Sequence, residues 1–188
     1  RGPPVPARLP VRAAGGRGGV LQEDGTADGG CVMANQIRSR GYAAIGLHSP
    51  KTPANIGGVL RAAGCYGAAM VAVQGCRYRR AATDTLAQHR HMPLVQTDNL
   101  HDVIPFNAVP VAVELVPHAR DITDYTHPET AFYVFGPEDS SLGASVLGWC
   151  RDVIYVPTDY CMNLAACVNV VLYDRMVKRA RAGARRAA

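Results

Sequence analysis

From residue 42 onward, short apolar runs alternate with longer segments whose apolar residues recur at helical spacing. The apolar runs are bounded by glycine, proline or polar residues, which is typical of strands buried on both faces. The pattern predicts six strands, at residues 43–47, 68–73, 94–97, 109–115, 131–135 and 153–156. It also predicts helices at 56–66, 142–150 and 163–181, a short helix at 83–89 and a helical turn at 99–105.

Alternation of buried strands with helices predicts an α/β domain with a mostly parallel sheet and helices on both faces. In such sheets, ligands bind beyond the carboxyl ends of the strands. The candidate chemistry should therefore lie in the loops that follow the strands. These loops are residues 48–55, 75–80, 115–120, 136–141 and 157–163.

The first 32 residues differ from the rest of the chain. They are rich in glycine, proline, alanine and arginine and show neither a helical nor a strand period, so we expect a disordered or non-native extension at 1–32. Without a continuous apolar segment, a secretory signal is not expected, and the acidic residues argue against an organellar transit peptide. One domain at 33–182 and a basic tail at 183–188 complete the predicted organisation.

Composition narrows the class of protein. The chain has 188 residues, of which 48% are hydrophobic, and this suffices for one domain core. Its longest apolar stretches fall well short of the roughly 20 residues that a membrane span needs. The net charge of +5 suits a polyanionic partner. Six scattered cysteines form no CxxC pair and no zinc-type spacing, so we expect no metal and a reduced, cytoplasmic protein.

The first candidate segment, NIGGVLR, opens the helix that follows the first strand. Asn55 can cap this helix, and Gly57 and Gly58 suggest the close approach of another backbone or of a ligand. Arg61 lies one turn after Gly57 and could bind a phosphate in a bidentate manner. A surface arginine in a solvent ion pair explains that position equally well. The segment is neither a dinucleotide fingerprint nor a P-loop.

Two later loops carry further candidates. The strand at 131–135 runs into FGPEDSS, where Gly136 offers backbone groups and Glu138 either orients other residues or simply favours a helix N-terminus. The strand at 153–156 runs into PTDYCMN, where Asn163 either faces a ligand or simply caps the last helix. Cys161 has no histidine near it in the sequence, although spatial proximity stays open. His89 and His91 flank Arg90 and are interpreted as solvated or RNA-facing residues.

These three segments, in this order, resemble the motifs of SPOUT RNA methyltransferases of the SpoU/TrmH type, in a minimal single-domain form. The family's Asn-x-Gly-x-x-x-Arg motif is seen at residues 55–61, and its Phe-Gly-x-Glu motif at 135–138. Its strand-Pro-loop-Ser-Leu-Asn motif is seen at 156–163. The resemblance covers about residues 42–180. The departures from the pattern are Cys161 for serine, Met162 for leucine, Ala165, Ser141 and a shorter loop after Pro157.

The resemblance implies a C-terminal trefoil knot, a homodimer, S-adenosyl-L-methionine as methyl donor and ribose 2′-O-methylation of RNA, with tRNA favoured over ribosomal RNA. It places Arg61 at the reacting hydroxyl, with Asn55 and Glu138 holding it in position. The implied cofactor-binding residues are Glu114, Leu115, Gly136, Val156, Cys161, Met162 and Asn163. We expect RNA to contact basic residues, namely Arg77, Arg79, Arg80 and Arg90, together with Lys178, Arg179, Arg181, Arg185 and Arg186 near the C-terminus. A solvated helix end explains the C-terminal group equally well.

Two other functions stay open at the level of sequence. One is a knotted RNA-binding protein without catalytic activity, for which the replacement of serine by Cys161 is the only support. The other is a nucleotide-binding α/β enzyme of a different kind, although the chain has no phosphate-loop signature.

Overall fold

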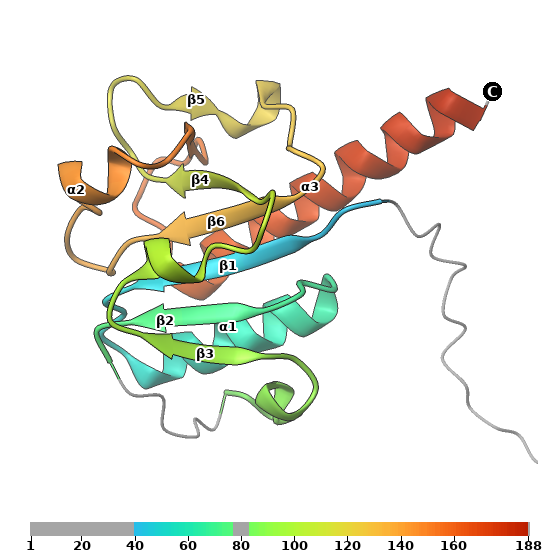
Figure 1. The fold of residues 1–188 in the computed structure, drawn as a ribbon. Helices are drawn as coiled ribbons and strands as arrows, with labels where there is room; N and C mark the ends of the chain where they lie inside the picture. The colour runs from blue at the N-terminus through green and yellow to red at the C-terminus, as the bar shows by residue number, and fades with distance from the viewer. Residues whose placement is uncertain (1–39, 77–82, 188) are drawn as a thin grey trace, which may run out of the picture. The chain divides into compact units, whose positions relative to one another are not determined.

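A computed structural model describes residues 40–76 and 83–187 of the chain. Seven strands form one sheet in the order β3-β2-β1-β6-β4-β7-β5, and every neighbouring pair is parallel (Figure 1). The strands are β1 (Ala43–His48), β2 (Val71–Gln74), β3 (Leu94–Thr97), β4 (Val109–Val113), β5 (Arg120–Asp121), β6 (Ala131–Phe135) and β7 (Asp152–Tyr155). Because the strands are parallel, their carboxyl ends all lie at one edge of the sheet.

Helices cover both faces of this sheet, as predicted. The α-helices are α1 (Pro53–Cys65), α2 (Ala144–Leu147) and α3 (Leu164–Ala187), and the 3₁₀-helices are η1 (Gln88–Arg90), η2 (Leu100–Val103) and η3 (Ile122–Asp124). On one face, α1 and α3 pack against each other and against a core that includes Ile45 and Tyr133. On the other face, η2 and α2 cover a smaller core that includes Phe132. The central strands β1 and β6 are buried almost throughout.

The start of α1 corrects one prediction. The helix begins at Pro53 and not at Ile56, and the residue before it, Thr52, is its N-cap. Proline suits the first helical position because its fixed φ matches the helix and its missing N–H would have no partner there. Asn55 therefore lies in the first turn and does not cap α1. Its side chain is free to serve another segment.

Other boundaries also differ from the prediction. The strand predicted at 68–73 is displaced to Val71–Gln74, since the backbone of residues 68 and 69 bonds to α1 and to β1 instead. The strand predicted at 109–115 ends at Val113. The helix predicted at 142–150 is only Ala144–Leu147, because Gly143 has a φ of +77° and starts the helix late. In place of the helix at 83–89, the described residues form turns and the short η1.

Two elements escaped prediction altogether. They are the two-residue strand β5 and the following η3, both too short and polar to give a period. The last helix is longer than predicted and extends to Ala187, so that residues 183–187 of the predicted basic tail continue α3. The extension predicted at 1–32 lies outside the described residues, and the trefoil knot stays a prediction.

A buried polar network attaches α3 to the segment between β5 and β6. The His127 ring is buried and lies between two partners, with Nδ1 2.6 Å from the Tyr133 hydroxyl and Nε2 2.8 Å from an Asp174 carboxylate oxygen. A neutral ring protonated at Nε2 satisfies both contacts, because Tyr133 then donates and Asp174 accepts. Burial lowers the pKa of His127 to about 4, despite the carboxylate of Asp174.

Basic residues of α3 complete the attachment. Arg175 is buried and donates to the backbone oxygens of Pro128, Glu129 and Tyr42. Lys178 donates to the Tyr125 oxygen at 3.1 Å and pairs with Asp174 at 2.8 Å, and Arg179 donates to the Arg40 oxygen. Lys178 and Arg179 therefore hold the fold together, which corrects their prediction as RNA-facing residues. Arg181 and Arg185 are exposed.

The His127 network predicts a stability that depends on pH. The unfolded chain takes up a proton at His127 as the pH falls from about 6.5 to about 4, whereas the folded chain does not. The free energy of unfolding should therefore fall by about 3 kcal/mol through this window. Urea denaturation at several pH values measures the fall, and the His127→Gln variant provides the reference, because other carboxyl groups titrate in the same range. Parallel curves for the two proteins would contradict the prediction.

Candidate functional site

A cleft of about 920 Å³ opens at the carboxyl edge of the sheet. The loops after β4, β6 and β7 line it, together with the first turn of α3. Its volume lies within the roughly 300–1,000 Å³ typical of small-molecule sites. The lining includes six of the seven predicted cofactor-binding residues, which are Glu114, Leu115, Gly136, Val156, Cys161 and Met162. Only Asn163 lies outside the lining, immediately beside it.

Asn163 connects the three predicted motifs through its side chain. Its amide oxygen accepts from the backbone N–H of Ala165 at 2.9 Å, so it caps α3. Its amide nitrogen donates to the Asn55 oxygen at 2.8 Å, and the Asn55 nitrogen donates in turn to Glu138. The prediction that Asn163 caps the last helix is therefore confirmed, whereas a contact of Asn163 with a ligand stays a prediction. We call Asn55, Glu138 and Asn163 the motif triad.

Glu138 is the anionic member of the triad and also receives the backbone N–H of Lys51 at 3.0 Å. Burial by itself would raise the pKa of Glu138, but the hydrogen bonds from Asn55 and Lys51 outweigh it and hold the pKa below its usual value. Next to it, the Lys51 ammonium pairs with Asp139. The loop after β1 is thereby attached to the loop after β6. The sequence analysis selected the loop at 48–55 but missed Lys51, because the only unusual feature of this residue is its position between Pro50 and Pro53.

The glycines of α1 allow this helix to approach α3 closely. A Cβ atom on Gly58 would lie 2.8 Å from the Cβ of Ala165, closer than two such carbons normally come. One of the two explanations offered by the sequence, close approach of another backbone, therefore holds for Gly58. The small size of Ala165, a departure from the family pattern, serves the same contact.

Glu114 organises the opposite wall of the cleft. One of its carboxylate oxygens accepts from the backbone N–H of Leu142 at 2.8 Å and from the Ser141 hydroxyl at 3.3 Å. The other accepts from the N–H of Leu115 at 3.0 Å. Gly136 lies under this arrangement, where an added Cβ would come within 3.3 Å of Leu142. Glu114 therefore fixes the loops after β4 and β6 relative to each other.

Two apolar side chains at the cleft are exposed. Leu115 is 73% exposed and Tyr160 is 88% exposed, and both line the cleft. The Thr158 hydroxyl donates to the Tyr160 backbone oxygen at 2.9 Å, which supports the short loop after β7. Sequence reasoning treated Tyr160 as an ordinary loop residue, since nothing in the local pattern distinguishes an exposed tyrosine from a buried one.

Arg61 lies on α1 six residues after Asn55, which corresponds to about 9 Å along the helix axis. Its side chain is exposed and makes no hydrogen bond or ion pair within residues 40–76 and 83–187. The resemblance implied that Asn55 and Glu138 hold Arg61 in position. In the structure, neither residue forms a hydrogen bond or ion pair with Arg61. They fix the first turn of the helix that carries it.

The remaining basic candidates divide into two groups. Arg90 is exposed, as an RNA-facing residue would be, whereas its neighbour His89 is half-buried beside Asp84 at 3.0 Å. His89 is therefore not a fully solvated residue, and the RNA-facing alternative stays a prediction. Arg77, Arg79 and Arg80 lie outside the described residues.

Two substitutions at Asn163 separate its two bonds. Asn163→Ala removes both the cap of α3 and the bond to Asn55, and should cost about 1–2 kcal/mol of unfolding free energy. Asn163→Ser restores a capping oxygen but is too short to reach Asn55, so it should recover part of this loss. Urea denaturation measures both values. Equal losses for the two variants would show that the cap contributes nothing.

Comparison with known proteins agrees with this geometry. In fold, the chain is similar to the SpoU methyltransferase AviRb from Streptomyces viridochromogenes, with a TM-score of 0.68, 20% identity and coverage of 78% of this chain and 63% of AviRb. It is also similar to the A. aeolicus TrmH/SpoU tRNA modifying enzyme (TM-score 0.69, 15% identity, 77% of this chain and 79% of that one). A third match is an RNA 2′-O ribose methyltransferase, with a TM-score of 0.65, 20% identity and coverage of 76% of this chain and 58% of that one.

These identities establish likeness of fold, and the chain spans less than two thirds of the length of AviRb. A search among curated proteins finds no sequence match. The model of the SpoU rRNA Methylase family, in contrast, matches residues 42–173, which include all three motifs and the complete sheet. This chain therefore belongs to the SpoU rRNA Methylase family.

Proposed function

We propose that this protein is an S-adenosyl-L-methionine-dependent RNA ribose 2′-O-methyltransferase. The observation that carries the proposal is the motif triad, which joins the start of α1, the loop after β6 and the start of α3 beside one cleft. The motif triad thus fixes the helix that carries the exposed Arg61 relative to the loops that line a cleft for a small molecule. Such an arrangement suits a reaction that brings two substrates together.

The cleft has the size and the chemistry for S-adenosyl-L-methionine. This cofactor carries a sulfonium and an ammonium group, and the lining contains the carboxylates of Glu114, Glu138, Asp139 and Asp159. The exposed Leu115 and Tyr160 offer apolar surface for an adenine ring. Support also comes from AviRb, whose structure is known in complex with AdoMet. The residues that would hold the cofactor are Glu114, Leu115, Gly136, Val156, Cys161, Met162 and Asn163.

When bound, the cofactor supplies a methyl group on a positively charged sulfur, and the ribose 2′-oxygen takes this methyl and loses its proton. We assign the substrate side of the reaction to Arg61. A guanidinium stays protonated and is therefore a poor base. It can bind the phosphate next to the target ribose and stabilise the negative charge that develops on the 2′-oxygen. A phosphate oxygen oriented in this way is a suitable acceptor for the proton.

Asn55 and Glu138 are positioning residues in this scheme. They fix the first turn of α1 against the loop after β6. Because Arg61 lies on the same helix, its backbone position relative to this loop is fixed as well. The low pKa of Glu138 keeps its carboxylate charged, so that its bonds to Asn55 and Lys51 persist through the neutral range.

We further propose tRNA as the substrate, with ribosomal RNA as the alternative. The TrmH/SpoU relative is a tRNA modifying enzyme, whereas the family is named for rRNA methylation. Arg90 and the basic segment with Arg77, Arg79 and Arg80 are the proposed RNA contacts. A knotted RNA-binding protein without activity is the second candidate, favoured by the replacement of serine by Cys161.

A homodimer is also part of the proposal. The outer side of α3 exposes Tyr173 (54%) and Met176 (46%), and Tyr173 contacts Tyr66 at the end of α1. Exposed apolar side chains grouped in this way are suited to an interface with a second copy.

The five cysteines in the described ranges are free thiols, and a reduced, cytoplasmic setting is proposed on that basis. Among the described residues, no helix is long and apolar enough to cross a membrane.

The role of Arg61 is tested by Arg61→Ala. Methyl transfer from labelled S-adenosyl-L-methionine to total tRNA should fall by about a hundredfold or more, because charge stabilisation at the reacting oxygen is lost. Calorimetry should show unchanged cofactor affinity, since Arg61 lies outside the cleft lining. Arg61→Lys keeps the charge without the bidentate geometry and should recover only part of the activity. Undiminished methylation by Arg61→Ala would contradict this role.

The position of Cys161 allows a chemical test of the cofactor site. Cys161 is exposed and lines the cleft, so alkylation with iodoacetamide should block cofactor binding. Burial raises the pKa of Cys150 to about 12 and that of Cys167 to about 11, so these thiols should react slowly. Cys161→Ser should bind the cofactor normally and resist the reagent, while the exposed Cys65 remains as an internal control. Inhibition of both proteins to the same extent would contradict the assignment.

A further inference from the structure

The loop between β6 and α2 forms one wall of the cleft and is held near both of its ends through a carboxylate. Near its start, Glu138 belongs to the motif triad and is bonded to Asn55 on α1. At its end, the backbone N–H of Leu142 donates at 2.8 Å to Glu114, which directly follows β4. Residues 136–140 of this loop line the cleft. The shape of the wall therefore depends on Glu114 as well as on the motif triad.

Most of the hydrogen-bonding capacity of the Glu114 carboxylate is used within the protein. Its Oε2 accepts from the Leu142 N–H and, at 3.3 Å, from the Ser141 hydroxyl, and its Oε1 accepts from the Leu115 N–H at 3.0 Å. A carboxylate offers about four acceptor positions, and three donors of the chain already contact this one. Glu114 is also half-buried. Little of the carboxylate is left for a cationic group of a cofactor.

The three bonds of Glu114 hold backbone on two sides of the cleft. On the side of β4, the bond to the Leu115 N–H fixes the backbone that carries the exposed Leu115 side chain. On the side of β6, the loop packs directly on the carboxylate, because a Cβ added to Gly136 would lie 3.6 Å from Oε2 and 3.3 Å from Leu142. Glu114 therefore determines the distance between these two parts of the lining.

Asp159 is a carboxylate of a different kind in the same cleft. It lies in the loop after β7, is exposed and lines the cleft. Within the described part of the chain, it makes no hydrogen bond or ion pair. Its charge is thus available to a cationic ligand, whereas the carboxylate of Glu114 is already bonded to the loops.

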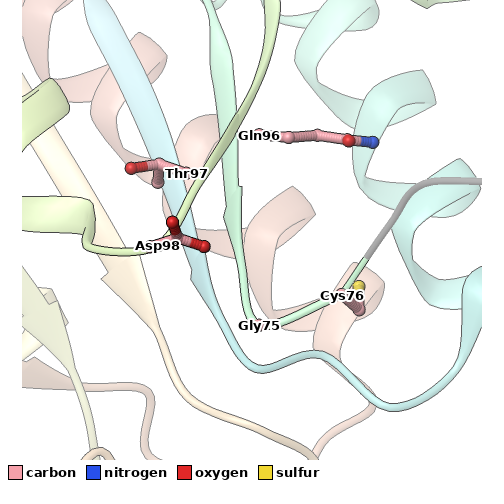
Figure 2. A pocket seen from close by; sticks show the side chains of 5 residues that line it. All are labelled: Gly75, Cys76, Gln96, Thr97 and Asp98. Atoms are coloured by element: carbon pink, nitrogen blue, oxygen red, sulfur yellow. The ribbon is translucent and has the colours of Figure 1, made fainter.

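A smaller hollow at the carboxyl ends of β2 and β3 has no comparable connection between loops. Its volume is about 370 Å³, and its lining is Gly75, Cys76, Gln96, Thr97 and Asp98 (Figure 2). Among the residues that the structure describes, the side-chain hydrogen bonds of this lining join only Thr97 to Asn99, two positions away. In the cleft, Glu114 instead reaches a partner 28 positions away.

We propose that Glu114 is a positioning residue for the cofactor, whose side chain sets the affinity of the cleft by holding Leu115 and the loop between β6 and α2 in place. The inference rests on the proposed function and deepens it, because it assigns the Glu114 carboxylate to the loops and not to the bound cofactor. Positioning requires hydrogen-bond acceptors at this place, whereas direct attraction of the cofactor requires negative charge. Substitutions that remove the two properties separately distinguish these roles.

Calorimetry on the full-length chain makes this distinction, with S-adenosyl-L-methionine and with its demethylated product S-adenosyl-L-homocysteine, whose sulfur is neutral. Glu114→Ala removes all three bonds and should weaken the binding of both molecules about tenfold, to the same extent. Glu114→Gln is also uncharged but keeps an oxygen for the Leu142 N–H, so it should recover part of this loss.

Two results would overturn the inference. A loss confined to S-adenosyl-L-methionine would indicate a contact of Glu114 with the sulfonium group. Equal losses in Glu114→Ala and Glu114→Gln would indicate a contact of its charge with the ammonium group, which both molecules carry. Glu129→Gln is the matched control and should bind both molecules normally, because Glu129 is exposed just before β6, at the opposite edge of the sheet from the cleft.

Amide hydrogen exchange tests the loop bonds without any cofactor. In Glu114→Ala, the amides of Leu115 and Leu142 should exchange faster than in the wild-type protein, because they lose their acceptor. Unchanged exchange at both amides would contradict the proposed positioning. The same experiment on Glu114→Gln should show Leu142 protected more than in Glu114→Ala, in parallel with the recovery of cofactor affinity.

Kinetics separates positioning from a purely structural role. Glu114→Ala should raise KM for S-adenosyl-L-methionine about tenfold, while kcat at saturating cofactor and KM for RNA stay unchanged. A purely structural role would lower the free energy of unfolding and leave KM for the cofactor unchanged, which would overturn the inference. Failure of the proposed function has a different signature, because the wild-type protein itself would then bind neither S-adenosyl-L-methionine nor S-adenosyl-L-homocysteine.

Discussion

The site depends on the two bonds of the Asn163 side chain. Its oxygen caps α3, and its nitrogen reaches Asn55 on α1, 108 positions away in the sequence. A serine at this position could cap the helix but could not reach α1, and an aspartate would bring no donor. Asparagine is therefore the residue type that meets both demands. Through Asn55 and Glu138, the same bonds determine where α1 begins relative to the loops of the cleft.

Close packing makes these bonds possible. The triad side chains are short, so α1 and α3 must approach each other closely at their N-terminal ends. Gly58 and Ala165 permit this approach, because any larger side chain on Gly58 would collide with α3. In the middle of α3, Arg175, Lys178 and the His127 network hold the helix to the segment before β6. The helix is thus attached both at its first turn, beside the cleft, and near its midpoint.

Charge is distributed in a way that suits a cationic cofactor and an anionic substrate. Four carboxylates line the cleft, whereas the exposed arginines Arg61 and Arg90 lie outside its lining. In a chain of net charge +5, this separation lets phosphates contact the outer surface while a positively charged group enters the cleft. Lys178 and Arg179 show that a basic residue near the C-terminus does not automatically belong to such a surface, because both bind backbone oxygens.

The sequence by itself determined the parallel α/β class, six of the seven strands, the three principal helices and the three motifs. These features follow from local periods and from short polar segments at fixed places between them. Tertiary structure decided where Asn55 acts, because its partners Glu138 and Asn163 lie 83 and 108 positions away in the sequence. It also decided the contact of Gly58 with Ala165 and the structural use of Lys178. Each of these depends on segments far apart in the chain that meet only when the strands align in one sheet, and no local pattern records which segments will meet.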